Sequence, residues 1–444
     1  MEQTGSLRLS INKQTLAIIA ILTGTFLVPV NSTMITIGLA SITETFSTTL
    51  TNVSWVVTIY LIIMIVTQPI AGKLGDMYGN RNMLLIGLVL FLVASIVCIY
   101  AQNLTMLIIG RAIQAIGGAL ISPNGTAILR FITPKEQLAK VFGLFGFSMS
   151  IGAAIGPLLG AFLINTWDWH STFWINIPLA TLSLVCSYKF LPIIDRRKNT
   201  ALDLLGSALL TMFLATVVLL VTYSLYSNLW MWLIIVISFV LFVYREKTYT
   251  HPLIDFALFK QMSFTSANLF ILLNNGIMYS TLLLMPIILA IDHHFTMTEI
   301  GLLLFVFSVS ISIFSWIGGN IDQKLGRANT IGLSFCCSAL ALCLYSLLPS
   351  SESLVVAASI LFFSGIGSGL GVPSMQAASL QAVEKEKSGV ASGIYSTFRY
   401  IGSTAAAVII SLQISYAITI ITLISCALIG IIIATFMHRV QLKV

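Results

Sequence analysis

Residues 72–81 read Gly-Lys-Leu-Gly-Asp-Met-Tyr-Gly-Asn-Arg, and residues 318–327 read Gly-Gly-Asn-Ile-Asp-Gln-Lys-Leu-Gly-Arg. Each segment places a glycine four residues before an aspartate and an arginine five residues after it. Each segment also follows a long apolar run. Because the same spacing occurs at two equivalent positions, we interpret the chain as an internal repeat of two halves.

The residue types in this repeated segment favour a mechanical role. Glycine permits tight turns and close approach of helices, and an aspartate can cap a helix and interact with its positive end. The pattern predicts a charged latch that holds one conformation and releases it. Its expected members are Gly72, Asp76, Gly79, Arg81, Asp322 and Arg327.

The composition places most of the chain in lipid. Of the 444 residues, 57% are hydrophobic and only 8% are charged, whereas a soluble domain carries roughly 25% charged residues. A spanning helix needs about 20 apolar residues, and fourteen segments meet this requirement. The predicted spans are 14–38, 52–71, 82–101, 105–126, 141–163, 171–191, 204–223, 229–244, 264–290, 298–318, 329–348, 354–376, 388–413 and 416–437.

The basic residues indicate the orientation. With the N-terminus inside, 20 of the 22 Lys and Arg residues fall in inner segments or, for Lys189, at the inner end of the sixth span, as is typical of cytoplasmic loops. The other two, Arg111 and Arg399, lie within spans. The net charge of +7 is therefore an orientation signal, and it does not favour a nucleic-acid partner.

These patterns predict an all-α polytopic membrane protein with fourteen transmembrane helices and both termini cytoplasmic. The expected organisation is a six-helix bundle over residues 1–191, an inserted helix pair over 204–244, and a second six-helix bundle over 264–444.

Further motifs follow the first in order along the chain. The fourth span contains Leu107-x-x-Gly110-Arg111-x-x-Gln114-x-x-Gly117, and the fifth contains Gly152-x-x-x-Gly156-Pro157-x-x-Gly160. Later stretches are Trp167-Asp168-Trp169 with Phe173, Asn176 and Pro178, then His251-Pro252-Leu253-Ile254-Asp255, and Gly389-Val390-Ala391-Ser392-Gly393 with Arg399 and Gly402.

With these motifs, essentially the whole chain resembles the major facilitator superfamily, and within it the fourteen-span drug:proton antiporter branch. The resemblance implies a proton-coupled multidrug efflux antiporter in a bacterial cytoplasmic membrane, working as a monomer without a cofactor. It also implies that Gly152, Gly156, Pro157 and Gly160 form an antiporter motif, in which small residues pack closely around a proline hinge. Two positions depart from the branch: Asn31 stands in place of an acid, and Asp168 in place of an arginine.

Proton coupling requires a carboxylate whose pKa is raised toward neutrality by burial, but none lies near the middle of a predicted span. The outer acids are therefore the candidates. We expect Glu299, at the start of the tenth span, to face a central cavity, and Asp168 and then Glu44 to be the alternatives. Arg111 is expected to modulate a nearby acid or to be a structural arginine. Asp292 and Glu352 are the remaining outer acids.

Drug-binding pockets are mainly apolar and aromatic, with few polar groups. The predicted substrate-binding residues are Asn31, Arg111, Gln114, Trp55, Tyr60, Asn274, Asn275, Met278, Phe305, Tyr395 and Phe398. An individual aromatic residue in this set is more often explained by packing or by contact with lipid.

Other functional classes lack their motifs. There is no phosphate-binding Gly-x-x-x-x-Gly-Lys-Ser/Thr, so ATP is not the expected driver, and no His-Glu-x-x-His or Gly-x-Ser-x-Gly indicates an enzyme. The adjacent Asp292, His293 and His294 are weak evidence for a metal, and none is predicted. The open alternatives are a nutrient or metabolite uniporter or symporter and, in a different class, a non-transporting membrane sensor.

Overall fold

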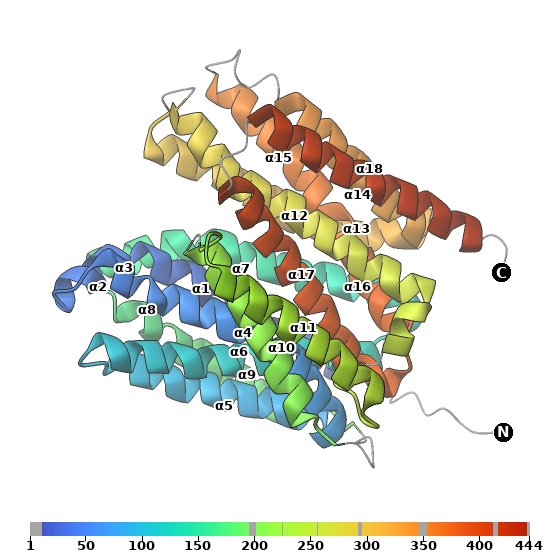
Figure 1. The fold of residues 1–444 in the computed structure, drawn as a ribbon, viewed down its shortest axis with the longest axis horizontal. Helices are drawn as coiled ribbons and strands as arrows, with labels where there is room; N and C mark the ends of the chain where they lie inside the picture. The colour runs from blue at the N-terminus through green and yellow to red at the C-terminus, as the bar shows by residue number, and fades with distance from the viewer. Residues whose placement is uncertain are drawn as a thin grey trace. The chain divides into compact units, whose positions relative to one another are not determined.

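The computed structural model describes residues 11–194, 201–223, 225–254, 256–291, 295–345, 353–411 and 416–441 (Figure 1). The described residues form helices and connecting turns. They fall into two compact units. Unit 1 comprises Met1–Lys135, Gly152–Phe256 and Val383–Ser396, and unit 2 comprises Glu136–Ile151, Ala257–Ala382 and Thr397–Val444.

Unit 1 carries the first repeat and the inserted helix pair. In chain order its helices are α1 (Ile11–Ile37), α2 (Leu39–Thr45), α3 (Leu50–Val53), α4 (Trp55–Tyr78), α5 (Asn80–Ile99), α6 (Leu104–Ile132), α8 (Ser171–Trp174), α9 (Asn176–Phe190), α10 (Leu204–Thr222) and α11 (Leu229–Thr248). The second part of α7 (Leu138–Thr166) and the first part of α17 (Ser388–Ser411) also belong to unit 1.

Unit 2 carries the second repeat. Its helices are α12 (Met262–Ile291), α13 (Met297–Leu325), α14 (Arg327–Leu344), α15 (Leu354–Leu370), α16 (Val372–Gln381) and α18 (Tyr416–Gln441), with the remaining parts of α7 and α17. Helix α13 packs on α15, and α14 packs on α15 and α18. Short 3-10 turns, η1 (Lys135–Gln137), η2 (Phe256–Lys260) and η4 (Lys385–Lys387), precede α7, α12 and α17.

The number of apolar helices differs from the predicted fourteen. Every predicted span overlaps a helix, but within the described ranges 12 helices are long and apolar enough to cross a membrane. The two predicted spans outside this set are 171–191 and 388–413. The first is divided at Ile175 into α8 and a 15-residue α9, shorter than the about 20 residues that a span needs. The second, α17, contains Arg399 and many small polar residues.

The inserted pair α10 and α11 packs as a hairpin, drawn side by side in green in Figure 1. Buried Asp203 caps the start of α10 by accepting the Gly206 N–H at 3.0 Å, and it pairs with Arg245 of α11 at 2.9 Å. Burial raises the pKa of Asp203, but hydrogen bonds from Arg245 and from the Gly206 N–H outweigh it and lower the pKa below its ordinary value. This ion pair joins the two ends of the hairpin that lie farthest apart in sequence.

The predicted division at 1–191, 204–244 and 264–444 follows the sequence repeat. The two units instead follow spatial contacts, and their boundaries fall within α7 and α17. The division into two bundles and an inserted pair stays a prediction.

Candidate functional site

A buried chain of amide side chains links α1, α6 and α9 in unit 1. The Asn31 Nδ2 donates to Gln114 Oε1 at 3.0 Å, and Asn31 Oδ1 accepts from Asn176 Nδ2 at 2.9 Å. Gln114 Nε2 in turn donates to Ser95 Oγ on α5 at 2.9 Å. An unpaired buried polar group is costly in an apolar interior, and this network pairs most of its polar atoms across four helices. Among the described residues, Arg111 Nη2 and Asn176 Oδ1 are the two network atoms without a hydrogen-bond partner.

Arg111 completes the network and is 0% exposed. Its Nη1 donates to Gln114 Oε1 at 2.6 Å and its Nε donates to Val56 O at 3.2 Å. The guanidinium carbon lies 4.2 Å from the centroid of the Tyr60 ring, a geometry that stabilises a cation over an aromatic face. Among the described residues no carboxylate forms an ion pair with Arg111, so the acid that it was expected to modulate is not found beside it.

The repeated segment of the first half forms a contact with α17. Asp76, near the end of α4, accepts the N–H groups of Gly389 at 2.8 Å and Val390 at 2.9 Å. These are orphan donors at a helix N-terminus, which favours an anion through its dipole. We name Asp76 with the Gly389 and Val390 N–H groups the α4–α17 latch.

Glycine is required for this approach. A Cβ at Gly72 would overlap the Gly389 carbonyl, and a Cβ at Gly393 would lie 2.7 Å from Gln68 O. Gly79, which ends α4, has a φ of 96°, in the region that favours glycine. The α4–α17 latch thus depends on glycine at positions 72, 79 and 393 as well as on Asp76.

Two further buried groups fix the latch region. Lys73 donates from Nζ to Pro252 O at 2.8 Å, and Glu246 accepts the Ile254 N–H at 2.7 Å. These bonds explain why the His251–Ile254 stretch forms part of a motif, because it connects the inserted pair to α4. Asn124 of α6 donates to Ala71 O at 3.2 Å. Asn124 and Lys73 were not predicted site residues, although a polar Asn124 inside an apolar run signals buried partners.

The other predicted latch members take different roles. Arg81 donates to Tyr188 O at 2.6 Å and lies over the Tyr188 ring, so it bonds α9 and not Asp76. In unit 2, Gly326 repeats the positive φ of Gly79, at 79°. Arg327 donates to Gln381 Oε1 at 3.0 Å, while the buried Asp322 Oδ1 has no hydrogen-bond partner among the described residues. The two repeats therefore share a turn but not the same contacts.

The glycine motif of α7 packs against α1. A Cβ at Gly152 would lie 3.0 Å from the Phe26 ring, one at Gly156 would overlap Thr33 Oγ1, and one at Gly160 would lie 2.8 Å from Met34 O. Helix α7 runs without interruption through Pro157. The stripe accounts for close packing, and its role as a hinge stays a prediction.

The predicted substrate-binding residues lie in two places. Asn31, Arg111, Gln114 and Tyr60 meet in the unit 1 network, whereas Trp55 packs on Tyr223 with ring centroids 5.4 Å apart. Tyr395 is buried in unit 1. The other five lie in unit 2: Asn274, Asn275, Met278, Phe305 and Phe398.

In unit 2 the two amides bond to backbone. Asn274 donates to Ser368 O at 2.9 Å and Asn275 donates to Ile271 O at 3.3 Å. The Asn274 Oδ1 is buried and has no hydrogen-bond partner among the described residues. Phe398 packs on Phe259, and Met278 and Phe305 are half-buried.

The candidate acids lie at helix ends. Glu299 is half-buried and forms a capping box with Thr296: each side chain bonds the other residue's backbone N–H. Its carboxylate therefore points back along the first turn of α13. Glu44 is exposed in α2. Asp292 and Glu352, together with His293, His294 and Asp255, lie outside the described residues.

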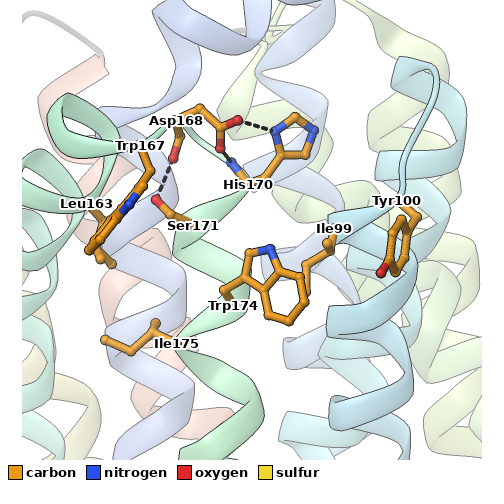
Figure 2. Close-up of a pocket in the computed structure, with 9 residues that line it drawn as sticks. All are labelled: Ile99, Tyr100, Leu163, Trp167, Asp168, His170, Ser171, Trp174 and Ile175. Carbon is orange, nitrogen blue, oxygen red and sulfur yellow. Dashed lines mark hydrogen bonds and ion pairs between the residues drawn. The ribbon is translucent and has the colours of Figure 1, made fainter.

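Asp168 lines a surface pocket of about 760 Å³ in unit 1 (Figure 2). The carboxylate lies 3.0 Å from His170 Nδ1 and accepts the His170 N–H at 2.8 Å. Figure 2 shows Trp167 and Leu163 on one side of the pocket and Tyr100 on the other, with the Asp168–His170 pair along one edge. The complete lining is Ile99, Tyr100, Leu163, Trp167, Asp168, His170, Ser171, Trp174 and Ile175.

Comparison with known proteins decides the family. Residues 21–407 match the sequence pattern of the Major Facilitator Superfamily. The chain belongs to this superfamily. It is therefore a multi-pass membrane transporter of small molecules and not an enzyme.

Three similar proteins illustrate the relationship. The chain is 43% identical over 434 residues, 96% of either chain, to the uncharacterized MFS-type transporter YvkA of Bacillus subtilis (strain 168). It is 29% identical over 360 residues, 79% of this chain and 70% of the relative, to Multidrug resistance protein 3 of the same organism. The crystal structure of the human organic anion transporter MFSD10 has the same fold, with a TM-score of 0.70 at 14% identity, covering 95% of this chain and 99% of MFSD10.

The unit 1 network predicts a stability effect for Gln114. Gln114→Met keeps the side chain's length but leaves Asn31 Nδ2 and Arg111 Nη1 without acceptors. Each buried orphan costs about 1–3 kcal/mol, so we expect a clearly lower thermal midpoint for the purified transporter. The control is Gln323→Met, which changes an exposed glutamine of α13. Equal midpoints for Gln114→Met and wild type would contradict a stabilising network.

The α4–α17 latch predicts that Gly389→Ala impairs the transporter. The new Cβ would overlap Asp76 Oδ1 and Gly72 O, and overpacking of this kind costs about 1–3 kcal/mol. We expect a lower thermal midpoint and slower substrate export in vesicles. Gly332→Ala is the matched control, because a Cβ there would meet only the Ala434 Cβ, at 3.7 Å. A Gly389→Ala variant that transports as fast as Gly332→Ala would exclude a close-approach requirement.

Proposed function

We propose that this transporter is a proton-coupled antiporter that exports amphipathic aromatic drugs, dyes or antiseptics from a bacterial cell by alternating access. The observation that carries the proposal is the α4–α17 latch. It consists of two hydrogen bonds between one carboxylate and one helix N-terminus. An anion at such a site is stabilised by at most about 2 kcal/mol. A contact of that size holds a conformation and can still be released during each cycle.

The substrate class is supported by the relatives and by the residues of the unit 1 network. Multidrug resistance protein 3 is one of the relatives. The network offers amides, one cation and a tyrosine face, and among the described residues no carboxylate belongs to it that could attract a cation. Neutral or zwitterionic aromatic compounds are therefore suited to it at least as well as dications. Export of a cation against the membrane potential opposes about 2.3 kcal/mol per charge per 100 mV, so electrogenic exchange of that substrate needs more than one proton.

The proposed topology has fourteen spans in the cytoplasmic membrane, with both termini inside and one chain as the working unit. It adds the α8–α9 pair and α17 to the 12 apolar helices. The support is the position of basic residues, since with this span number 20 of 22 fall in the inner segments or, for Lys189, at the inner end of a span.

Glu299 is the proposed proton carrier, with Asp168 and then Glu44 as the alternatives. The capping box gives Glu299 a defined position at the start of α13. A glutamine also completes a capping box, so Glu299→Gln separates the titratable proton from the helix cap.

The proposal is tested by proton release from acid-loaded proteoliposomes after addition of ethidium or a fluoroquinolone. We expect drug-dependent release that is absent from liposomes without protein. No release from folded, correctly reconstituted protein would contradict drug:proton exchange for these compounds and favour the uniporter or symporter alternative.

We expect Glu299→Gln to abolish this drug-dependent release while leaving the thermal midpoint near that of the wild type. The matched control is Glu136→Gln, which neutralises an exposed acid of η1. Undiminished proton release from Glu299→Gln would eliminate Glu299 as the carrier and leave Asp168 and Glu44.

A further inference from the structure

The pocket at the end of α5 and α7 is held in shape by Trp169. The two tryptophans that flank Asp168 have opposite environments: Trp167 is 69% exposed and Trp169 is 1% exposed. Trp169 packs among Ile35, Ile42 and Phe173 and donates from Nε1 to Thr45 Oγ1 at 3.0 Å. This anchor fixes the backbone on both sides of Asp168, so the acid has a defined place at the pocket's edge.

The Asp168 carboxylate is fixed as well. The His170 N–H and the His170 ring both lie within hydrogen-bond distance of it, and that ring stacks on Trp169 with centroids 3.6 Å apart. The Asp168 side chain nevertheless remains 56% exposed. Its negative charge thus stays available to a ligand in the pocket while its position is restrained.

The walls around this acid are aromatic. Trp167, Trp174 and Tyr100 are each more than half exposed and line the same pocket (Figure 2). No lysine or arginine lines it. An interfacial belt of aromatic residues is usual in membrane proteins, but a belt does not account for a restrained acid among three exposed rings.

We propose that this pocket is a binding site for aromatic organic cations, separate from the unit 1 network. Asp168 supplies the counter-charge, and the faces of Trp167 and Trp174 supply cation–π and stacking contacts. The volume of about 760 Å³ is within the range of drug-sized pockets, about 300–1,000 Å³. The site accepts its ligand from solution, so its occupancy does not require transport.

The site also assigns Asp168 a role of its own. As an exposed and restrained acid it serves as a fixed counter-charge at the rim of the pocket. With Asp168 in this role, the candidate proton carriers are Glu299 and Glu44. With the proposed topology, the ends of α5 and α7 and the start of α8 lie on the outer side, where an exported cation would leave.

Photolabelling of the detergent-purified full chain with ethidium monoazide tests the proposal, with mass spectrometry locating the labelled peptides. We expect label within residues 163–175. Tetraphenylphosphonium should compete for this label, whereas triphenylphosphine oxide, which is uncharged and of similar shape, should not. Equal competition by both compounds would overturn the requirement for a cation.

Variants separate the acid from the rings. Asp168→Asn keeps an oxygen acceptor for the His170 N–H but removes the charge, and we expect the apparent Kd for labelling to rise roughly two- to fivefold, as for an exposed charge pair. Trp174→Ala should raise it by a similar, roughly two- to fivefold factor. Asp168→Glu keeps the negative charge and should therefore be labelled like the wild-type chain. The controls are Glu386→Gln, an exposed acid of η4, and Trp230→Ala, an exposed tryptophan of α11.

Wild-type labelling of residues 163–175 in Asp168→Asn would overturn the proposal, as would absence of label there in the wild-type chain. A thermal midpoint for each variant shows that it is folded. The assay is independent of drug:proton exchange. Failure of proton release with intact labelling contradicts only the proposed function, and the reverse result contradicts only the cation site.

Discussion

Asp76 lies where α4 meets the N-terminus of α17, and its carboxylate accepts two N–H groups that have no partner within their own helix. This contact sets a strict steric condition on the surrounding residues. The two helix backbones approach closely at Gly72, Gly389 and Gly393. A Cβ at any of these positions would collide with the facing helix. On α17, two residues after Val390, Ser392 forms a side-chain hydrogen bond with Thr126 of α6. Where α4 and α17 cross, close approach and charge therefore act together.

The buried polar residues of unit 1 follow a different rule. In a low-dielectric interior each donor and acceptor needs a partner, and Asn31, Gln114 and Asn176 supply partners to each other and to Arg111. With an asparagine at position 31, the network has a charge that does not change with pH in the range where carboxylates titrate. In the proposed function, proton coupling then depends on an acid elsewhere in the chain, which separates the proposed substrate contacts from the proposed proton path.

Much of the helical fold was predictable because a long apolar run that crosses lipid must pair its own backbone N–H and C=O groups, and a helix does so. The repeated turns at Gly79 and Gly326 were also predictable, since the spacing of glycine, aspartate and arginine recurs. The partners of these residues were not. Asp76 bonds Gly389, 313 residues away, and no local pattern specifies such a contact. Arg81 was expected beside Asp76 but bonds the Tyr188 carbonyl, because it begins a helix that packs on α9.

The predicted orientation of Glu299 toward a cavity stays a prediction, and it did not use a local signal. Thr296-x-x-Glu299 is a capping-box sequence, and the structure forms that box. The network residues were found more successfully, since Asn31, Arg111 and Gln114 are polar groups inside apolar runs and must meet partners there. Asn176 was part of a quoted motif, but its place beside Asn31 needed the tertiary structure. The pocket at Asp168 likewise depends on the opposite burial of Trp167 and Trp169, which two identical residue types cannot reveal.

The α4–α17 latch is tested most directly by asking whether the charge of Asp76 holds α4 against α17. Spin labels are attached at Tyr78→Cys and Glu386→Cys, both exposed, in a variant from which the native cysteines have been removed. Pulsed electron paramagnetic resonance then measures the distance between the two labels. We expect one short distance with Asp76 and a shift to longer distances with Asp76→Asn, because the new amide places a donor against backbone N–H groups. Identical distance distributions in the two chains would contradict the latch and with it the proposed conformational cycle.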